Sequence, residues 1–203
     1  MFARTCSSGV SGFSIVPRYS VHVPRRQTRP APLPDLWLLS DARNDARLEQ
    51  ALRALPRGSG FVFRHYHLAS DARRRRFEEL AQVARGCGHA AILSGSAGEA
   101  ERWRADGLYG PAGCIGPGGP RLRIATAHDR AEIEAANAIG ADAVMLSPVF
   151  ATRSHPDAPA LGPERFRALA ALARMPVIAL GGMTAARARE LDWPRWAAID
   201  GLS

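Results

Sequence analysis

GADAVMLSPVFATRSHPDAPALG, at Gly140–Gly162, and PVIALGGMT, at Pro176–Thr184, decide the fold of this 203-residue chain. Each stretch holds a wholly apolar run, Ala143–Leu146 or Val177–Leu180, that is bounded by Gly or Pro and too short for a helix. Such runs are typical of strands buried on both faces, as in parallel α/β sheets. Small and hydroxylated residues follow each run, and the carboxyl ends of parallel strands use such residues to hold a phosphate. The two stretches therefore predict neighbouring strands that end at an anion site.

The rest of the chain alternates short apolar runs with amphipathic helical patterns. Further strands are predicted at Leu36–Leu39, Gly60–His67, Ala90–Leu93, Gly107–Tyr109, Leu122–Thr126 and Trp196–Ile199. Helices are predicted at Asp45–Leu55, at Ser70–Gly86 with Ser70 as its cap, at Ala97–Trp103, from the Asp129/Glu132 capping pattern to Gly140, from Pro163, and at Thr184–Leu191. Eight strands alternating with helices predict a (β/α)8 TIM barrel. The chain stops directly after the eighth strand, so we expect a truncated C-terminal helix.

The positive charge of the chain is concentrated at its beginning. Residues 1–34 contain five arginines and no acidic residue, out of a net charge of +8 for the whole chain. We interpret 1–34 as a disordered basic extension, with an upstream mis-start or a transit peptide as alternatives, and 35–203 as the barrel. The run Arg73–Arg76 is followed at once by Glu78 and Glu79, which favours a solvated helix face over a nucleic-acid patch. We therefore do not expect nucleic-acid binding.

Composition excludes several other classes of protein. The chain has no lysine, which excludes a Schiff-base aldolase and a P-loop kinase, since both chemistries need that amine. Three cysteines without a C-x-x-C pair argue against a disulfide framework or a zinc ribbon, and indicate a reducing, cytoplasmic setting. No apolar run reaches the roughly 18 residues of a membrane-spanning helix, so no membrane partner is expected.

Hydroxyl and glycine residues after the two quoted strands form the predicted phosphate site. Ser147 directly follows one strand, and Thr152 and Ser154 lie two apart in the loop beyond it, where both hydroxyls can face one anion. Gly181 and Gly182 follow the other strand and allow the backbone to approach a ligand closely. The alternative is a glycine-rich turn beside a polar loop.

The quoted stretches resemble the thiamine phosphate synthase and thiazole tautomerase family, and the resemblance extends from Leu36 to the C-terminus. It implies a (β/α)8 barrel with small phosphorylated substrates as partners and leaves a homo-oligomer open. The synthases join a pyrimidine diphosphate to a thiazole phosphate with loss of pyrophosphate, and the tautomerases isomerise the thiazole precursor. By resemblance, Thr152 and Ser154 contact the leaving pyrophosphate, while Gly181 and Gly182 bind the thiazole phosphate.

Two histidines acquire candidate roles through this resemblance. Thr126–Ala127–His128 is similar to the family's Ser-x-His, and the tautomerases use a histidine at that place for proton transfer. His128 is accordingly the predicted catalytic residue, with a capping role at the next helix as the alternative. His155 stands where the synthases commonly carry lysine, so that an imidazolium there would favour pyrophosphate, unless Ser154–His155–Pro156 is only a turn.

The second predicted strand, which contains FVFRHYHL, resembles the family's Gln-x-Arg-x-Lys. Arg64 matches the arginine, whereas Val62 replaces the glutamine and Tyr66 replaces the lysine. Because Arg64 and Tyr66 are two apart, they share a strand face, and both are predicted to bind substrate. An arginine inside a barrel needs an anion or an acidic partner, so a structural ion pair is the alternative for Arg64. We expect His65 and His67 to be structural.

The largest departure from the family concerns magnesium, which the synthases hold with aspartates after the third and fourth strands. Here those places read Ser94–Gly95–Ser96 and Gly110–Pro111–Ala112–Gly113, without a carboxylate, and Asp200 is unfavourable near a phosphate. No protein metal ligand is identified, and any Mg²⁺ is expected to be carried by the substrate pyrophosphate. The predicted function is a thiamine phosphate synthase-like transferase of thiamine biosynthesis. A metal-independent thiazole tautomerase-type isomerase and a non-catalytic phosphate-ligand-binding relative remain alternatives.

Overall fold

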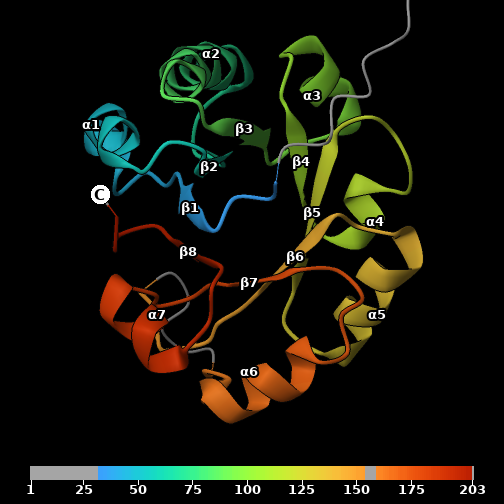
Figure 1. The fold of residues 1–203 in the computed structure, drawn as a ribbon. Coiled ribbons are helices and arrows are strands. Elements are labelled where there is room, and N and C mark those ends of the chain that lie inside the picture. Colours follow the sequence, from blue (N-terminus) through green and yellow to red (C-terminus); the bar gives the residue numbers. More distant parts are fainter. Residues whose placement is uncertain (1–31, 154–158, 203) are drawn as a thin grey trace, which may run out of the picture. The chain divides into compact units, whose positions relative to one another are not determined.

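The computed structural model describes residues 32–153 and 159–202. The chain divides into two units, Met1–Pro32 and Leu33–Ser203, and every described residue except Pro32 belongs to the second. Most of the predicted extension therefore lies outside the described residues, and so do Ser154 and His155. Figure 1 shows the second unit as a ring of strands surrounded by helices.

Eight parallel strands close into a barrel in sequence order, which confirms the predicted fold. The strands are β1 (Leu36–Leu39), β2 (Gly60–Phe63), β3 (Ala90–Leu93), β4 (Gly107–Gly110), β5 (Leu122–Ala127), β6 (Ala143–Leu146), β7 (Val177–Ala179) and β8 (Trp196–Ala198). Each strand is only three to six residues long and almost wholly buried. Short apolar runs of this kind are typical of parallel strands, and the barrel buries them on both faces.

Helices follow the strands and pack against the outside of the barrel (Figure 1). They are η1, a 3-10 turn (Asp45–Arg47), α1 (Leu48–Ala54), α2 (Ser70–Gly86), α3 (Ala97–Arg102), α4 (Ala112–Ile115), α5 (Arg130–Ile139), α6 (Gly162–Ala170) and α7 (Ala185–Leu191). No helix in the described ranges is long and apolar enough to cross a membrane.

Successive side chains of each strand point alternately into two cores, because side chains in a strand alternate between its two faces. One core lies between the sheet and the helices, and the other fills the barrel interior. The interior residues are Trp37, Leu39, Val62, Ile92, Tyr109, Ile124, Ala143, Met145, Ile178 and Ala197. Trp37 occupies the space beside Gly60, where a Cβ would come within 2.1 Å of its ring. The interior is thus a packed core, and the register of each strand decides which later residues face inward.

Several local predictions need correction. β2 ends at Phe63, so Arg64 and Tyr66 lie beyond the strand rather than in it. Ser70 is the first residue of α2 and not its cap, because Ala69 occupies the cap position and no side chain caps this helix. The segment predicted as one helix from Asp45 starts as a 3-10 turn, and a short helix that was not predicted, α4, follows β4.

The capping residue of α5 is confirmed, although its partner behaves differently. Asp129 accepts a hydrogen bond from the backbone N–H of Glu132 at 3.0 Å, and Gly140 ends the helix with φ +61°. The Glu132 carboxylate does not complete the reciprocal box, since it accepts from the N–H of His128 at 2.6 Å instead. This hydrogen bond links α5 to His128, the residue before its cap.

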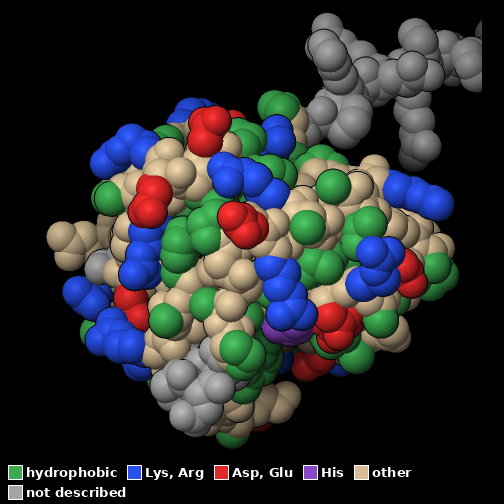
Figure 2. All heavy atoms as spheres, turned by 90° about the horizontal axis from the view of Figure 1, so that it is seen from below, with side chains coloured by type: hydrophobic (Ala, Val, Ile, Leu, Met, Phe, Trp, Pro, Cys, Tyr) green, Lys and Arg blue, Asp and Glu red, His purple; other side chains and the backbone are tan. Residues whose placement is uncertain are grey.

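The run Arg73–Arg76 is a solvated face only in part. Arg74 is exposed, but Arg76 pairs with Asp45 at 2.8 Å and with Glu49. Arg73 donates to the backbone oxygen of Arg64 at 3.0 Å and lies 5.5 Å from the ring centre of Trp103. Two of these arginines therefore hold α2 against the barrel. On the face drawn in Figure 2, basic and acidic side chains are interspersed rather than gathered in one basic patch.

Candidate active site

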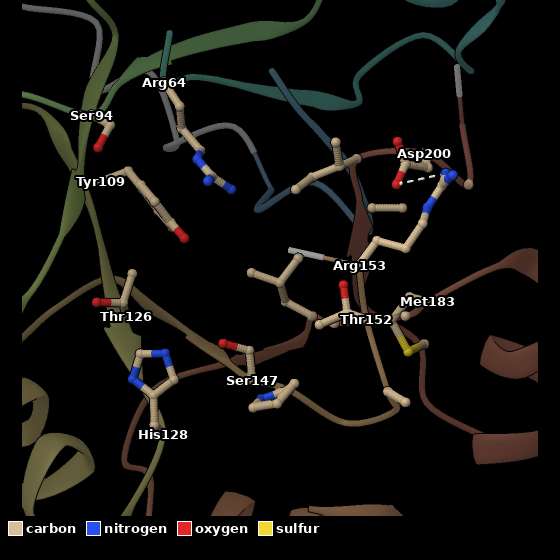
Figure 3. A pocket seen from close by; sticks show the side chains of 18 of the residues that line it. Arg64, Ser94, Tyr109, Thr126, His128, Ser147, Thr152, Arg153, Met183 and Asp200 are labelled. Atoms are coloured by element: carbon tan, nitrogen blue, oxygen red, sulfur yellow. Dashed lines mark ion pairs between the residues drawn. The ribbon is translucent and has the colours of Figure 1, made fainter. Parts of the chain in front are cut away.

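A pocket of about 700 Å³ lies at the carboxyl end of the barrel, among the loops that follow the strands (Figure 3). The floor of the pocket is formed by one residue at or just after the end of each of six strands. Each of these residues lies two positions beyond a member of the interior core and therefore faces the same way. These residues are Arg64, Ser94, Thr126, Ser147, Leu180 and Ile199. Four of these six residues are polar, so the apolar interior gives way to a mostly polar layer where the strands end. This is the end of a parallel barrel at which enzymes of this architecture carry their active sites.

The loops after β6 and β7 meet at one side of this pocket. The N–H of Val149 donates to the oxygen of Leu180 at 2.9 Å, and that of Phe150 donates to Gly181 at 3.1 Å. Gly181 has φ +96°, and a Cβ on it would lie 2.6 Å from the Cα of Pro148. Only glycine accommodates both this backbone conformation and this close approach. The two loops are therefore interlocked, and we name the segment Gly181–Thr184 the glycine cradle.

Backbone donors of the glycine cradle are available to a ligand. The segment lines the pocket, and among the described residues no acceptor is paired with the N–H groups of Gly181, Gly182 or Met183. Arg187 also lines the pocket, and its guanidinium donates to the oxygen of Gly182 and lies 5.0 Å from the Phe150 ring centre. Unpaired N–H groups beside a guanidinium form a favourable environment for an oxyanion.

The predicted hydroxyl residues lie at this pocket where the structure describes them. Ser147 and Thr152 are half-buried and line it, and so does Thr126 at the end of β5. Ser154 and His155 fall outside the described residues. The predicted hydroxyl pair is therefore represented by Thr152 alone.

Arg64 and Tyr66 line the opposite wall. The guanidinium of Arg64 lies 3.8 Å from Asp41 Oδ2, and Arg43 binds the other oxygen, Oδ1, more closely at 2.9 Å. Partial burial acts to raise the pKa of Asp41, but the hydrogen bonds from Arg43 and the charge of Arg64 outweigh it and lower that pKa. Among the described residues the Arg64 side chain makes no hydrogen bond, so most of its donors remain available. The Tyr66 ring is 63% exposed, and its hydroxyl lies 2.6 Å from Ser94 Oγ.

His65 points away from the pocket. It is buried, stacks on Phe63 and contacts Ser40 and Asp45 at 2.7 and 2.8 Å. Burial lowers its pKa, and the hydrogen bond from the His65 ring to the Asp45 carboxylate opposes that shift only in part. His67 is exposed and does not line the pocket.

His128 lies at the edge of the pocket (Figure 3). Its side chain is 55% exposed, and its Nδ1 lies 2.8 Å from the Glu132 carboxylate. The same carboxylate accepts from the backbone N–H of His128, so both the ring and the backbone of this residue are held. Because Nδ1 is occupied, Nε2 is the nitrogen left to exchange a proton with a ligand.

Asp200 lies in the pocket wall after β8 with two arginine partners. Its carboxylate lies 3.1 Å from Arg153 and 3.4 Å from Arg43, and Figure 3 shows the pair with Arg153. Sequence reasoning identified Asp200 as unfavourable for a phosphate but did not identify Arg153. The pairing explains how the acid is tolerated there, since each arginine neutralises part of its charge.

The described residues do not fit a protein-bound Mg²⁺. No group of three or more His, Cys, Asp or Glu side chains within the described ranges could hold a metal ion. Asp200 is the only carboxylate among the described residues that line the pocket, and arginines occupy it. Ser94 and Gly110 stand where the resemblance expects carboxylates. Magnesium favours carboxylate oxygens, so this wall offers it no binding site.

Replacing Asp200 by Asn should strengthen anion binding. The change removes a negative charge from the pocket and releases Arg153 and Arg43 from it. We expect inorganic phosphate to bind about five- to tenfold more tightly, equivalent to about 1 kcal/mol of relieved repulsion near a protein surface. Isothermal titration calorimetry of both proteins measures this. Weaker binding by Asp200→Asn would mean that the carboxylate is needed to position the arginines.

Solved structures share this fold. The thiamine phosphate pyrophosphorylase from Pyrococcus furiosus superposes with a TM-score of 0.66 at 21% identity, over 81% of this chain and 85% of that one. A thiamine phosphate pyrophosphorylase from Bacteroides thetaiotaomicron gives 0.51 at 14% identity, over 82% of each chain. The YdjI aldolase from Escherichia coli gives 0.57 at 10% identity, over 82% of this chain and 75% of that one. At these identities the likeness establishes the architecture alone.

Sequence comparison identifies the family. A curated protein of Aquifex aeolicus, named "Putative thiamine-phosphate synthase 2", is 39% identical over 59 residues. The match spans 29% of this chain and about a third, 32%, of that protein. The family model described as thiamine monophosphate synthase matches residues 36–193, which is most of the barrel. The chain therefore belongs to the thiamine monophosphate synthase family.

Proposed function

We propose that this protein is a thiamine phosphate synthase-like transferase, which joins hydroxymethylpyrimidine diphosphate to thiazole phosphate and releases pyrophosphate. The observation that carries the proposal is the interlock of the loops after β6 and β7, which places the glycine cradle in the pocket wall. A second set of donors on the wall that holds Arg64 provides for a second anionic group. Family membership supports the same assignment.

The glycine cradle would bind the phosphate of the thiazole substrate. Arg64 and Thr152 would bind the diphosphate of the pyrimidine substrate and stabilise the charge that develops as it leaves. During transfer the bond between the pyrimidine methylene carbon and the diphosphate oxygen breaks, and its electron pair stays on oxygen. The thiazole nitrogen then forms the new bond to that carbon. His128 would act as an imidazolium, donating its Nε2 proton to the departing oxygen while its Nδ1–H stays bonded to Glu132.

No step in this scheme uses a protein-bound metal, because the described pocket residues do not fit one. The charge of the leaving group is instead met by guanidinium, hydroxyl and imidazole groups. Any Mg²⁺ would enter on the diphosphate itself.

An isomerase acting on a thiazole phosphate is the second candidate. The pairing of His128 with Glu132 favours it, since this is the arrangement that a general base needs for moving a proton on a substrate carbon. Such a reaction needs only the glycine cradle, His128 and no diphosphate site. It differs from the transferase in requiring one substrate instead of two.

The direct test is turnover of the purified full chain with both substrates, with Mg²⁺ and with a chelator, followed by chromatography of thiamine phosphate and assay of pyrophosphate. We expect equal amounts of both products, and no heat when the protein alone is titrated with Mg²⁺. Product formation that depends on a tight protein–Mg²⁺ complex would contradict the assignment of the anion site. Absence of product at saturating substrates, with isomerisation of the thiazole phosphate precursor, would transfer the assignment to the second candidate.

A further inference from the structure

Tyr109 is a buried residue whose hydroxyl group faces the pocket. It lies in β4 opposite Ile124 of β5, and its side chain belongs to the interior core. The residue is only 7% exposed, yet it lines the pocket, and Figure 3 shows its hydroxyl pointing into the cavity between Arg64 and Ser147. Neither the predicted site nor the function proposed above assigns it a role.

This hydroxyl has no hydrogen-bond partner among the described residues. The residue is buried, but its oxygen faces the open pocket, where water can bond to it until a ligand takes that place. Protein interiors rarely leave such groups unpaired unless a ligand or a water completes them. The neighbouring Tyr66 shows the contrast, since its hydroxyl is already bonded to Ser94 Oγ at 2.6 Å. Tyr109 is therefore a donor kept available in the pocket.

Its protonation state limits what it can bind. Burial raises the pKa of Tyr109 to about 12, although the charge of Arg64 opposes the shift. The phenol consequently stays neutral at physiological pH and keeps its proton. The nearby charged group is the Arg64 guanidinium, which only donates, whereas the phenol can donate and accept. A donor-only cation beside a neutral O–H donor is complementary to an acceptor that carries negative charge.

We propose that Tyr109 donates a hydrogen bond to an anionic oxygen of the bound ligand, in a subsite that it forms with Arg64 across the pocket from the glycine cradle. The inference rests on the proposed function for the identity of that ligand. With the thiazole phosphate in the glycine cradle as proposed, the diphosphate of the pyrimidine substrate supplies this oxygen; if the two substrates exchange sites, the thiazole phosphate supplies it. In either case Tyr109 is a specificity-determining residue, because it rejects a ligand with no oxyanion at that place.

Tyr109→Phe tests the proposal, since it removes the hydroxyl and keeps the ring that fills the barrel interior. Inorganic pyrophosphate and thiazole phosphate are titrated separately into the full-length protein and the variant, in the presence of a chelator. We expect one of the two ligands to bind about 10- to 100-fold more weakly, as for loss of a hydrogen bond to a charged group. The weakened ligand identifies the source of the oxyanion. The thermal midpoint of the variant should be unchanged or higher.

A spectroscopic measurement reports on the hydroxyl itself. The chain contains three tyrosines, so ¹³Cζ-tyrosine labelling gives a simple spectrum in which the Tyr109 signal is the one that Tyr109→Phe removes. We expect that signal to shift when the responsible ligand saturates the protein. A Tyr109 signal that stays in place with both ligands bound, or affinities that Tyr109→Phe leaves unchanged for both, would overturn the proposal, and so would a wild-type protein that binds neither ligand. Because these measurements need no turnover, a protein that binds through Tyr109 but forms no product would contradict only the proposed reaction.

Discussion

His128→Asn should reduce turnover by about 100- to 10,000-fold, the range for losing a positioned proton-transfer group. Asparagine can hydrogen-bond but cannot exchange a proton, and it leaves the backbone contact to Glu132 possible. Affinity for thiazole phosphate should change by less than about threefold, because the glycine cradle follows β7 whereas His128 follows β5. Steady-state kinetics beside calorimetric titration separates the two effects.

The matched control is His67→Asn, at an exposed histidine that does not line the pocket. We expect wild-type kinetics from it. If His128→Asn retains more than about a tenth of wild-type turnover, His128 contributes no more than one hydrogen bond and its catalytic assignment is wrong.

Gly181→Ala should abolish anion binding and destabilise the fold. The new Cβ would lie 2.6 Å from the Cα of Pro148 and 2.7 Å from its Cβ, at a backbone φ of +96°. The loops must then separate, with an expected loss of about 3 kcal/mol or more from overpacking and backbone strain combined. Thermal unfolding should shift downward by about 10 °C, and phosphate-ester affinity should fall at least about 100-fold.

Two glycines provide controls for this change. Gly58→Ala has a comparable cost from backbone strain, at φ +85°, but its new Cβ has no atom within 4 Å. It therefore measures the effect of backbone strain without a steric collision. Gly113→Ala, in α4, has neither problem. Neither glycine lines the pocket, so both variants should keep wild-type affinity. An affinity for Gly181→Ala equal to that of Gly58→Ala would show that the interlock of the two loops does not shape the site.

The barrel was predictable from sequence because most strands are short apolar runs that local composition identifies. Such runs, as at Ala143–Leu146 and Val177–Ala179, indicate the order of elements without reference to the rest of the fold, and β4 is the weakest of them. The glycine cradle was predictable for the same reason, since Gly181 and Gly182 directly follow such a run. Local errors arose where the chain offers competing partners. Serine is a common capping residue, but Ser70 is the first residue of the helix. The Glu132 carboxylate accepts from the backbone N–H of His128 instead of that of Asp129.

Other pocket residues depend on contacts that sequence patterns do not reveal. Arg153 pairs with Asp200 across 47 positions of the chain, and Arg73 reaches the oxygens of Arg64 and Ser94. Tyr109 was missed because GLYG has too few apolar residues to establish which face of the strand points inward. The register opposite Ile124 resolves that question once the barrel is closed. The patterns that predict strands and helices lie within short stretches of sequence, whereas the polar lining of a pocket depends on tertiary contacts between distant residues.

A binding comparison between thiazole phosphate and its unphosphorylated alcohol tests the account most directly. The two ligands differ only in the group that the glycine cradle would hold, at the N–H groups of Gly181, Gly182 and Met183. The account predicts that the phosphate ester binds at least about 100-fold more tightly to the wild-type protein, as several hydrogen bonds to a charged group require. Equal affinities would mean that no oxyanion is bound between the two loops, and the enzymatic interpretation would fail with them.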